Sequence, residues 1–283
     1  MKLAHIIMAY KEPSQIARLI ERLSHPDCDI YIHLDRKIPF EPFRFLSELP
    51  RVHFIKNRIL CNWGGFSFIT ATIESMREVL TSGPYDMLNL LSGQDYPIKS
   101  VNEIYSYFKE NQDKVFTIYE LEDSDVWWQH ATTRFEQYHF TDLRFKGRYI
   151  LQGLLNKFLP KRTFPLPYVL YGSSNSTWWT MNRPSVQYII DSIDTLPSLK
   201  RFMRYTWAAD EFLFPTLLKN SSFSNMLTND NKRFIRWNKG QANPKVLGKA
   251  DFESLATSDH LFARKFDINV DADILDMIDR NLL

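Results

Sequence analysis

The stretch 88–99, LNLLSGQDYPIK, changes within a few residues from a buried strand to a polar turn. Its first four residues are apolar except for one Asn, which is the pattern of a strand in a protein core. The strand ends at Ser92-Gly93, and Gln94 and Asp95 follow at once. Because ligands of α/β proteins bind at the carboxyl ends of strands, these two polar side chains indicate a binding site.

Strands and helices alternate over the first 120 residues. Apolar or alternating runs predict strands at 2–9, 29–35, 51–55, 85–91 and 114–120. Apolar residues at helical spacing predict helices at 14–23, 66–80 and 100–110. Alternation of this kind is typical of a mostly parallel sheet flanked by helices, an α/β architecture. The strand ends would then gather polar residues at one edge of the sheet: Tyr10, Lys11, Asp35, Gln94 and Asp95.

The pattern is less regular after residue 120. Aromatic-rich loops around residues 127–140 are expected to lead to a strand near 176–181 and a second strand near 233–237. Helices are predicted at 183–194, 208–219 and 271–282. No linker separates the two halves, 1–120 and 121–283, so we expect a single domain over residues 1–283.

Composition narrows the class of protein. The 283 residues are 44% hydrophobic, which is enough for a sizeable core. A net charge of +2 does not indicate a nucleic-acid partner, and none is expected. Cys28 and Cys61 fit neither a disulfide framework nor a metal motif, which favours a reducing cytoplasm. The apolar run at the N-terminus is too short to span a membrane, so we expect a soluble protein without a secretion signal.

The chain lacks the two common glycine-rich phosphate loops, GxGxxG and GxxxxGK[ST]. This weighs against a dehydrogenase and against a P-loop ATPase. A nucleotide or nucleotide-sugar at the polar sheet edge remains the favoured ligand.

Several motifs occur in one order along the chain: IHLDRK (32–37), NWGG (62–65), LNLLSGQDYPIK (88–99), DEFLFPTLL (210–218), RFIRW (233–237) and LFARKFD (261–267). Together they resemble the family of core-2 β-1,6-N-acetylglucosaminyltransferases and peptide O-xylosyltransferases. The resemblance spans residues 3 to about 270, and the third and last motifs are its most specific parts. The sequence lacks the membrane anchor and the disulfides of the animal members, so it looks like a bacterial relative.

The resemblance implies a GT-A fold, a nucleotide-binding α/β sandwich with a mostly parallel central sheet flanked by helices. It implies transfer of a sugar from a UDP donor with inversion and without a metal ion. The first half of the chain would bind the nucleotide, and the second half would face the acceptor. UDP-N-acetylglucosamine is the expected donor and UDP-xylose the alternative. A glycan or lipid-linked saccharide, in surface polysaccharide assembly, is the expected acceptor.

Glu211 is the predicted general base, because inverting transfer requires one beside the acceptor hydroxyl. It begins a predicted helix on the side of Phe214 and Leu218, where partial desolvation would raise the pKa of its carboxyl. The resemblance independently implies the same role. An acid in a first helical turn can instead complement the helix dipole, a role that Asp210 can also fill.

Positive charge is needed beside the leaving diphosphate. Lys265 in LFARKFD matches a phosphate-binding lysine of the family, and Arg264 precedes it. Lys245 in NPKVLGKAD is a further candidate, although a gap makes its alignment ambiguous. A solvated surface charge is the alternative interpretation of each.

Four residues are assigned to the uridine and the sugars. Asp35 matches an acid that contacts uridine in the family, and Trp237 matches an aromatic residue at the sugar site. Gln94 and Asp95 are expected to offer hydrogen bonds to sugar hydroxyls. The alternative for Asp35 is an aspartate in a turn at the end of a strand, and for Trp237 it is core packing. For Gln94 and Asp95 it is an ordinary strand-to-helix turn capped by Asp95.

Two Asp-x-Asp triplets occur, at residues 123–125 and 271–273. Neither follows the LNLL strand, where a GT-A metal motif belongs, and the second is expected to begin a helix. No metal and no other cofactor is therefore expected, with the UDP-sugar as co-substrate. The alternatives are a metal-dependent transferase that uses Asp123 and Asp125, and an inactive carbohydrate-binding relative.

No acidic residue lies between Leu143 and Ile190. Cations and large apolar residues are interleaved there, namely Arg144, Lys146, Arg148, Lys157, Lys161, Arg162 and Arg183 with Leu154, Leu155, Phe158 and Leu159. A basic, apolar segment suits an anionic membrane surface. We therefore expect a cytoplasmic protein with peripheral contact at the inner face of the membrane, and a loop with chance clustering of charge is the alternative.

Overall fold

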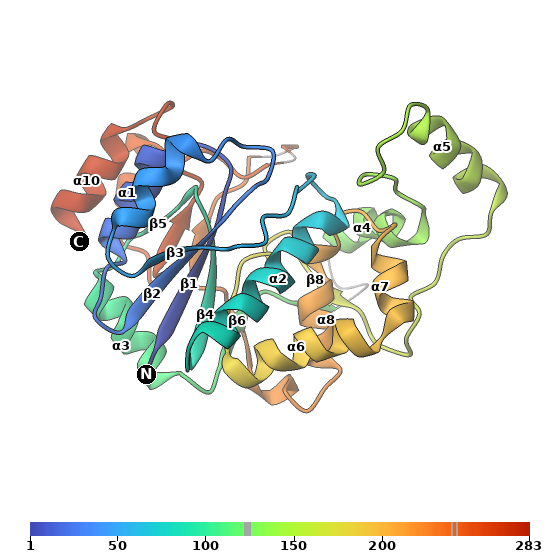
Figure 1. Cartoon of the computed structure of the whole chain (residues 1–283), viewed down its shortest axis with the longest axis horizontal. Coiled ribbons are helices and arrows are strands. Elements are labelled where there is room, and N and C mark those ends of the chain that lie inside the picture. Colours follow the sequence, from blue (N-terminus) through green and yellow to red (C-terminus); the bar gives the residue numbers. More distant parts are fainter. Residues whose placement is uncertain (122–125, 239, 242) are drawn as a thin grey trace.

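The computed structural model describes residues 1–121, 126–238, 240–241 and 243–283, and Figure 1 shows a central sheet with helices on both sides. Seven strands form the main sheet in the order β10-β6-β9-β4-β1-β2-β3. Their bounds are β1 (Leu3–Ala9), β2 (Cys28–Leu34), β3 (Val52–Phe54), β4 (Met87–Ser92), β6 (Val115–Thr117), β9 (Thr180–Asn182) and β10 (Leu227–Asn229). Strand β9 runs antiparallel to both its neighbours, and the other pairs are parallel. The predicted α/β sandwich with a mostly parallel sheet is confirmed.

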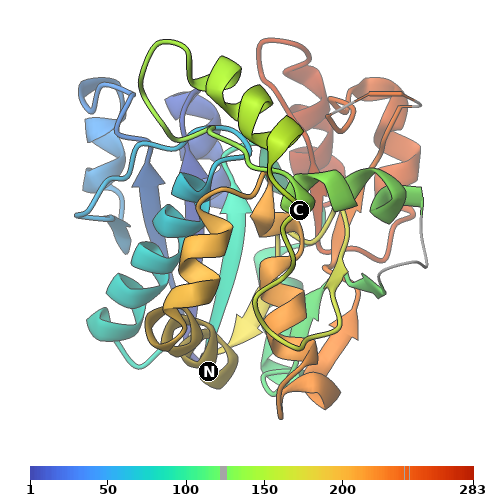
Figure 2. The same cartoon turned by 90° about the vertical axis from the view of Figure 1, so that its right-hand side faces the viewer.

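Burial on both faces explains why the central strands are almost continuously apolar. Every residue of β1 is buried, and its side chains alternate between the two hydrophobic clusters of the protein. One cluster lies against α1 (Pro13–Arg22), α3 (Val101–Glu110) and α10 (Asp273–Asn281). The other lies against α2 (Phe66–Ser82), α6 (Arg183–Thr195), α7 (Pro197–Met203) and α8 (Leu213–Lys219). Figure 2 shows the sheet strands behind the helices of this second layer.

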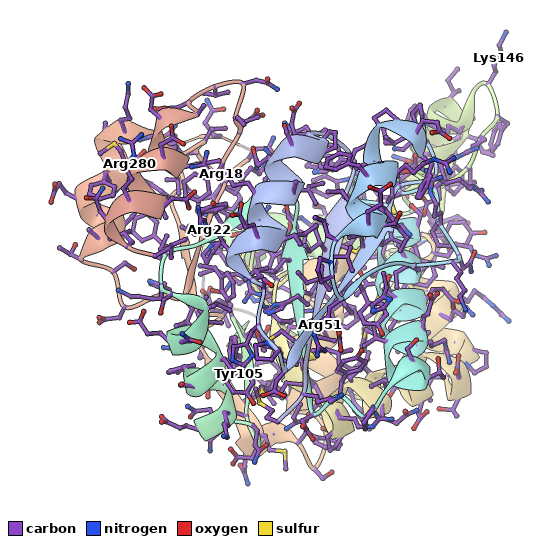
Figure 3. The ribbon with its side chains drawn as sticks, turned by 60° about the vertical axis from the view of Figure 1, so that its left-hand side comes forward. Arg18, Arg22, Arg51, Tyr105, Lys146 and Arg280 are labelled. Carbon is purple, nitrogen blue, oxygen red and sulfur yellow. The ribbon has the colours of Figure 1, made fainter. Side chains whose placement is uncertain are left out.

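Ion pairs join the first and last helices. Arg18 of α1 lies 2.7 Å from a carboxylate oxygen of Asp279, and Arg22 lies 3.0 Å from the other. Figure 3 shows both arginines directed from α1 toward α10. The C-terminal helix is thereby fixed to the N-terminal half of the sheet.

A second, three-stranded sheet was not predicted. It consists of β11 (Arg233–Ile235), β12 (Phe262–Arg264) and β5 (Asp95–Pro97), in that order. Strand β5 leaves the polar turn after β4 and pairs antiparallel with β12. The turn that we expected to be a loop therefore connects the two sheets.

The prediction of loops over residues 127–140 was wrong for its first part, because Val126–Glu136 forms helix α4. Trp128, Ala131 and Phe135 are buried at helical spacing and pack in the cluster that contains Phe212. Aromatic residues thus form the apolar stripe of this helix, where aliphatic residues are usual.

Smaller elements complete the chain. They are the antiparallel pair β7 (Glu120–Leu121) and β8 (Tyr171–Gly172), the helices α5 (Arg148–Phe158) and α9 (Phe252–Ala256), and the 3₁₀ turns η1 (Glu41–Glu48), η2 (Ala209–Glu211), η3 (Ser224–Met226) and η4 (Lys249–Asp251). Among the described residues, none of the helices combines the length and the apolar composition that a membrane span requires.

Candidate active site

A cavity of about 460 Å³ lies where β1, β2 and β4 end, a volume typical of sites for small ligands. It is lined both by residues that follow these strands and by residues from the second half of the chain. The cavity is lined by most of the predicted site residues: Asp35, Gln94, Glu211, Trp237, Arg264 and Lys265. Asp95 and Lys245 do not line it. Folding thus brings together polar residues that are as far apart in the sequence as Asp35 and Lys265.

Glu211 is the last residue of η2, a short 3₁₀ turn before α8, and not part of the longer helix predicted at 208–219. Its carboxylate forms an ion pair with Arg134 of α4 and accepts a hydrogen bond from Trp127 Nε1 at 3.2 Å. Burial raises the pKa of the Glu211 carboxyl to about 7, while the charge of Arg134 lowers it. The direction of this shift is the one that the sequence predicts. A carboxylate that titrates near neutral pH and faces a cavity suits a general base.

Arg134 is held by aromatic rings. Its guanidinium carbon lies 4.7 Å from the ring centre of Trp207 and 5.2 Å from that of Trp127. A side chain stacked in this way has little freedom to leave Glu211. Sequence reasoning missed Arg134, because one cation in a segment interpreted as loop carries no signal.

The NWGG motif shapes the wall beside this cluster. Gly64 has φ +67°, and a Cβ atom there would lie 2.2 Å from Nε1 of Trp207. Its carbonyl oxygen accepts a hydrogen bond from the backbone N–H of Ala208 at 2.8 Å. A glycine is therefore required, since the chain passes directly over Trp207 with a left-handed backbone. Trp63 extends from this turn with 67% of its surface exposed.

Asp210 also lines the cavity. Its carboxylate accepts a hydrogen bond from Thr177 Oγ1 at 2.7 Å, and burial raises its pKa. Helix α8 begins after both acids, at Leu213. Of the two neighbouring acids, Glu211 is the one that contacts a cation.

Positive charge also lines the cavity. Lys265 follows β12, and its ammonium nitrogen lies 3.2 Å from Asn243 Oδ1. Burial lowers the pKa of Lys265, and the neighbouring Arg264 and Lys11 act in the same direction. Lys11 is paired with Asp267 at 2.5 Å, so its charge is already balanced. Lys265 has no such carboxylate partner among the residues that the structure describes, and a bound anion would stabilise its charge.

Asp95 is buried behind the cavity lining, with 0% of its surface exposed. One carboxylate oxygen accepts a hydrogen bond from the backbone N–H of Ser92 at 3.0 Å, and the other lies 3.2 Å from Nε of Arg264. Burial raises the pKa of the Asp95 carboxyl, and the charge of Arg264 opposes that effect. In this structure Asp95 holds the turn and Arg264, and it does not reach the cavity.

Lys245 also has a partner away from the cavity. Its ammonium nitrogen lies 2.7 and 2.8 Å from the two carboxylate oxygens of Asp251. Arg236 contacts the same carboxylate at 2.6 Å. Because Asp251 is only 1% exposed, both cations balance a buried charge.

The polar residues at the strand ends are already oriented. Oδ1 of Asp35 accepts hydrogen bonds from the backbone N–H groups of Lys37 at 2.9 Å and Cys61 at 3.4 Å. The side-chain oxygen of Gln94 accepts a hydrogen bond from the hydroxyl of Tyr10 at 2.8 Å. These contacts fix the two side chains at the floor of the cavity.

Trp237 follows β11 and is 36% exposed at the cavity wall. Its indole N–H donates to Asn175 Oδ1 at 3.0 Å. The hydrogen bond fixes the ring while leaving part of its surface open. A partly open aromatic ring is suited to packing against the apolar face of a sugar.

A second hollow, of about 410 Å³, adjoins the first because Asn62 lines both. Arg36, Arg144 and Arg204 line it, and none of their side chains has a hydrogen bond or ion pair within the described part of the chain. The acid in its wall, Asp142, is occupied by neutral donors, since it accepts hydrogen bonds from Asn62 and from the backbone and side chain of Ser67.

Metal ligands do not cluster in the described ranges, which contain no group of three or more His, Cys, Asp or Glu side chains suited to an ion. The predicted alternative site at Asp123 and Asp125 lies outside the described residues. In the second triplet, Asp271 accepts a hydrogen bond from the backbone N–H of Lys249 at 2.9 Å, and Asp273 lies 2.7 Å from the ammonium of Lys249.

Known proteins are similar in sequence to this chain over its whole length. Xylosyltransferase 1 of Rattus norvegicus is 25% identical over 306 residues, which cover 100% of this chain and 35% of the relative. Xylosyltransferase 2 of Homo sapiens is 24% identical and matches 100% of this chain and 34% of its own length. The chain therefore spans about a third of the length of these relatives.

Among solved structures, mouse xyloside xylosyltransferase 1 in its apo form aligns with a TM-score of 0.44 and 11% identity, over 93% of this chain and 97% of that one. The profile of the Core-2/I-branching enzymes matches residues 3–256. The match covers most of the chain and includes all but one of the motifs on which the sequence resemblance rests. The protein belongs to the family of Core-2/I-branching enzymes, which are glycosyltransferases.

Proposed function

We propose that this protein transfers a sugar from a UDP donor to a hydroxyl of a glycan acceptor, with inversion at the anomeric carbon. The observation that carries the proposal is that one cavity is lined by both Glu211 and Lys265. Glu211 removes the proton from the acceptor hydroxyl as its oxygen bonds to the anomeric carbon. The bond from that carbon to the diphosphate breaks, and UDP leaves with the bonding electrons beside Lys265.

The other cavity residues supply binding. Asp35 receives the uridine, and Gln94 and Trp237 face the sugars. Lys265, which has no carboxylate partner in the described part of the chain, neutralises charge on the diphosphate, and Arg264 lies beside it in the cavity lining, so the reaction requires no metal ion. Asp95 and Lys245 contribute indirectly in this proposal, through the buried pairs that fix Arg264 and the loop after β11.

Two donors are candidates. N-acetylglucosamine is the first, from the motifs shared with the core-2 enzymes. Xylose is the second, and the names of the curated relatives favour it. Measuring UDP release from both UDP-sugars decides between them, and detectable release from either excludes an inactive carbohydrate-binding protein.

The second hollow, lined by Arg36, Arg144 and Arg204 and called here the arginine-lined hollow, supports an acceptor that carries an anionic group. Three guanidinium groups lie next to the cavity and have no side-chain partner within the described residues, and such groups bind a phosphate or a carboxylate by bidentate hydrogen bonds. A lipid-linked saccharide carries such a phosphate. We further propose that the protein meets this acceptor at an anionic membrane surface, from the cytoplasmic side.

The first prediction concerns Glu211. Glu211→Gln should retain UDP binding and lower the turnover of the donor by about a hundredfold or more, because the amide cannot accept the proton. Turnover is measured as UDP release, and binding by thermal shift with UDP. Glu253→Gln, an exposed acid on α9, is the matched control and should behave as wild type. A Glu211→Gln variant of near-normal rate would exclude the residue from the mechanism.

The second prediction concerns pH. Because the base must be deprotonated, kcat/KM should rise with pH and level off above about 7, the pKa of Glu211. Arg134 lowers this pKa, so Arg134→Gln should move the rise to higher pH by about one unit or more. Arg134→Lys keeps a positive charge, so its profile should lie between those of wild type and Arg134→Gln. A pH profile that is identical in all three proteins would show that Arg134 does not act on the base.

The third prediction concerns the diphosphate. UDP binding and UDP release should be unchanged in excess EDTA, because fixed cations replace the ion. Lys265→Ala should weaken UDP binding by about tenfold or more and leave uridine binding nearly unchanged. Activity that EDTA abolishes and manganese restores would contradict the proposal and direct attention to Asp123 and Asp125. Equal weakening of UDP and uridine would assign Lys265 a structural role.

A further inference from the structure

Helix α5 (Arg148–Phe158) has its polar side toward the protein and its apolar side toward solvent. None of its residues is buried. Ile150, Leu154 and Phe158, spaced four apart on one stripe, are 73%, 50% and 74% exposed. An ordinary surface helix has the opposite arrangement, with its apolar stripe against the core.

Two polar residues on the other side hold the helix in place. The side-chain oxygen of Gln152 accepts a hydrogen bond from the backbone N–H of Phe140 at 2.8 Å. Asn156 accepts one from the N–H of Tyr138 at 2.7 Å and donates one to its carbonyl oxygen at 2.9 Å. The outward direction of the apolar stripe is therefore fixed by specific contacts and is not a consequence of a detached helix.

The helix projects at one end of the molecule. Figure 1 shows α5 at the end opposite to α10, separated from the sheet by α4 and α7. In Figure 3, Lys146, in the turn that leads into α5, extends away from the protein. Large exposed residues surround the stripe: Phe145, Tyr149, Leu151 and Leu159. Such an extensive exposed apolar patch marks an interaction site.

The charge around the patch identifies its occupant. Arg144, Lys146 and Lys157 flank the apolar stripe, and no ion pair in the described part of the chain involves any of them. Lys161 is paired, with Glu136 at 2.7 Å. An apolar partner surface would cover the stripe and leave these cations unbalanced, whereas a surface of anionic lipids satisfies both.

We propose that the outward face of α5 inserts into the headgroup region of an anionic membrane, with the flanking cations on the lipid phosphates. The inference rests on the proposed membrane contact, which it narrows to one helix face. It does not depend on the transfer reaction, because none of these residues lines the catalytic cavity. Arg144 belongs to the adjoining hollow, so the docked face and the acceptor side of the protein are continuous.

The test is sedimentation of the whole protein with vesicles of phosphatidylcholine alone or mixed with phosphatidylglycerol. Wild type should bind the mixed vesicles at low salt, bind phosphatidylcholine weakly, and be released at high salt. The double variant Ile150→Ser, Phe158→Ser should lose about tenfold or more in binding, since it removes the two most exposed apolar groups of the stripe. Lys146→Gln, Lys157→Gln should lose binding to the mixed vesicles only.

Val270→Ser is the matched control, because Val270 is 66% exposed and precedes α10 at the other end of the molecule. It should bind vesicles as wild type does. UDP release should be equal in all variants, so a failure of the catalytic proposal is measured separately. Absence of vesicle binding by wild type overturns the inference. Conversion of a wild-type dimer to a monomer by the serine variant, without vesicle binding, also overturns it and assigns the patch to a second copy of the chain.

Discussion

The pairing of β5 with β12 is the constraint on which the cavity depends. It places Asp95 opposite Arg264 in the register of the two strands, with their charged groups 3.2 Å apart in the interior. Either charge alone would be costly to bury, so each residue requires the other. The next residue, Lys265, is thereby brought beside Gln94 at the end of β4. The backbone N–H of Phe266 completes the contact by donating to the carbonyl oxygen of Gln94 at 2.9 Å.

A second ion pair, between Arg134 and Glu211, sets the chemistry of the predicted base. Burial by itself would raise the pKa of Glu211 beyond the value of about 7, and Arg134 limits the rise. A base with a much higher pKa would be protonated at neutral pH, and one with an ordinary pKa would accept a proton poorly. The aromatic rings of Trp127 and Trp207 support this balance, because they keep Arg134 in place beside the carboxylate.

Local pattern was sufficient for the main sheet except its edge strand β10, and for the flanking helices except α7, since strands buried on both faces and amphipathic helices have clear periodicities. The pattern was not sufficient for contacts between distant segments. The second sheet depends on pairing of β5 with a strand more than 160 residues later. From sequence, Asp95 and Lys245 were assigned to ligands, because a polar turn and a basic loop look alike whether their charges face a cavity or a buried partner. Arg134 was missed because a single cation in a segment interpreted as loop gives no sign that it will pair with Glu211.

Helix α5 is another case in which contacts between separate segments, which the sequence does not predict, decide the functional interpretation. Its basic and apolar composition was visible in the sequence, but composition does not say which face of a helix points outward. Gln152 and Asn156 settle that question, because they use their polar groups to bind the protein backbone. The arginine-lined hollow then lies between this outward face and the catalytic cavity. A transferase held at a lipid surface by α5 would meet a lipid-linked acceptor at a raised effective concentration, so weak binding in the hollow would be enough.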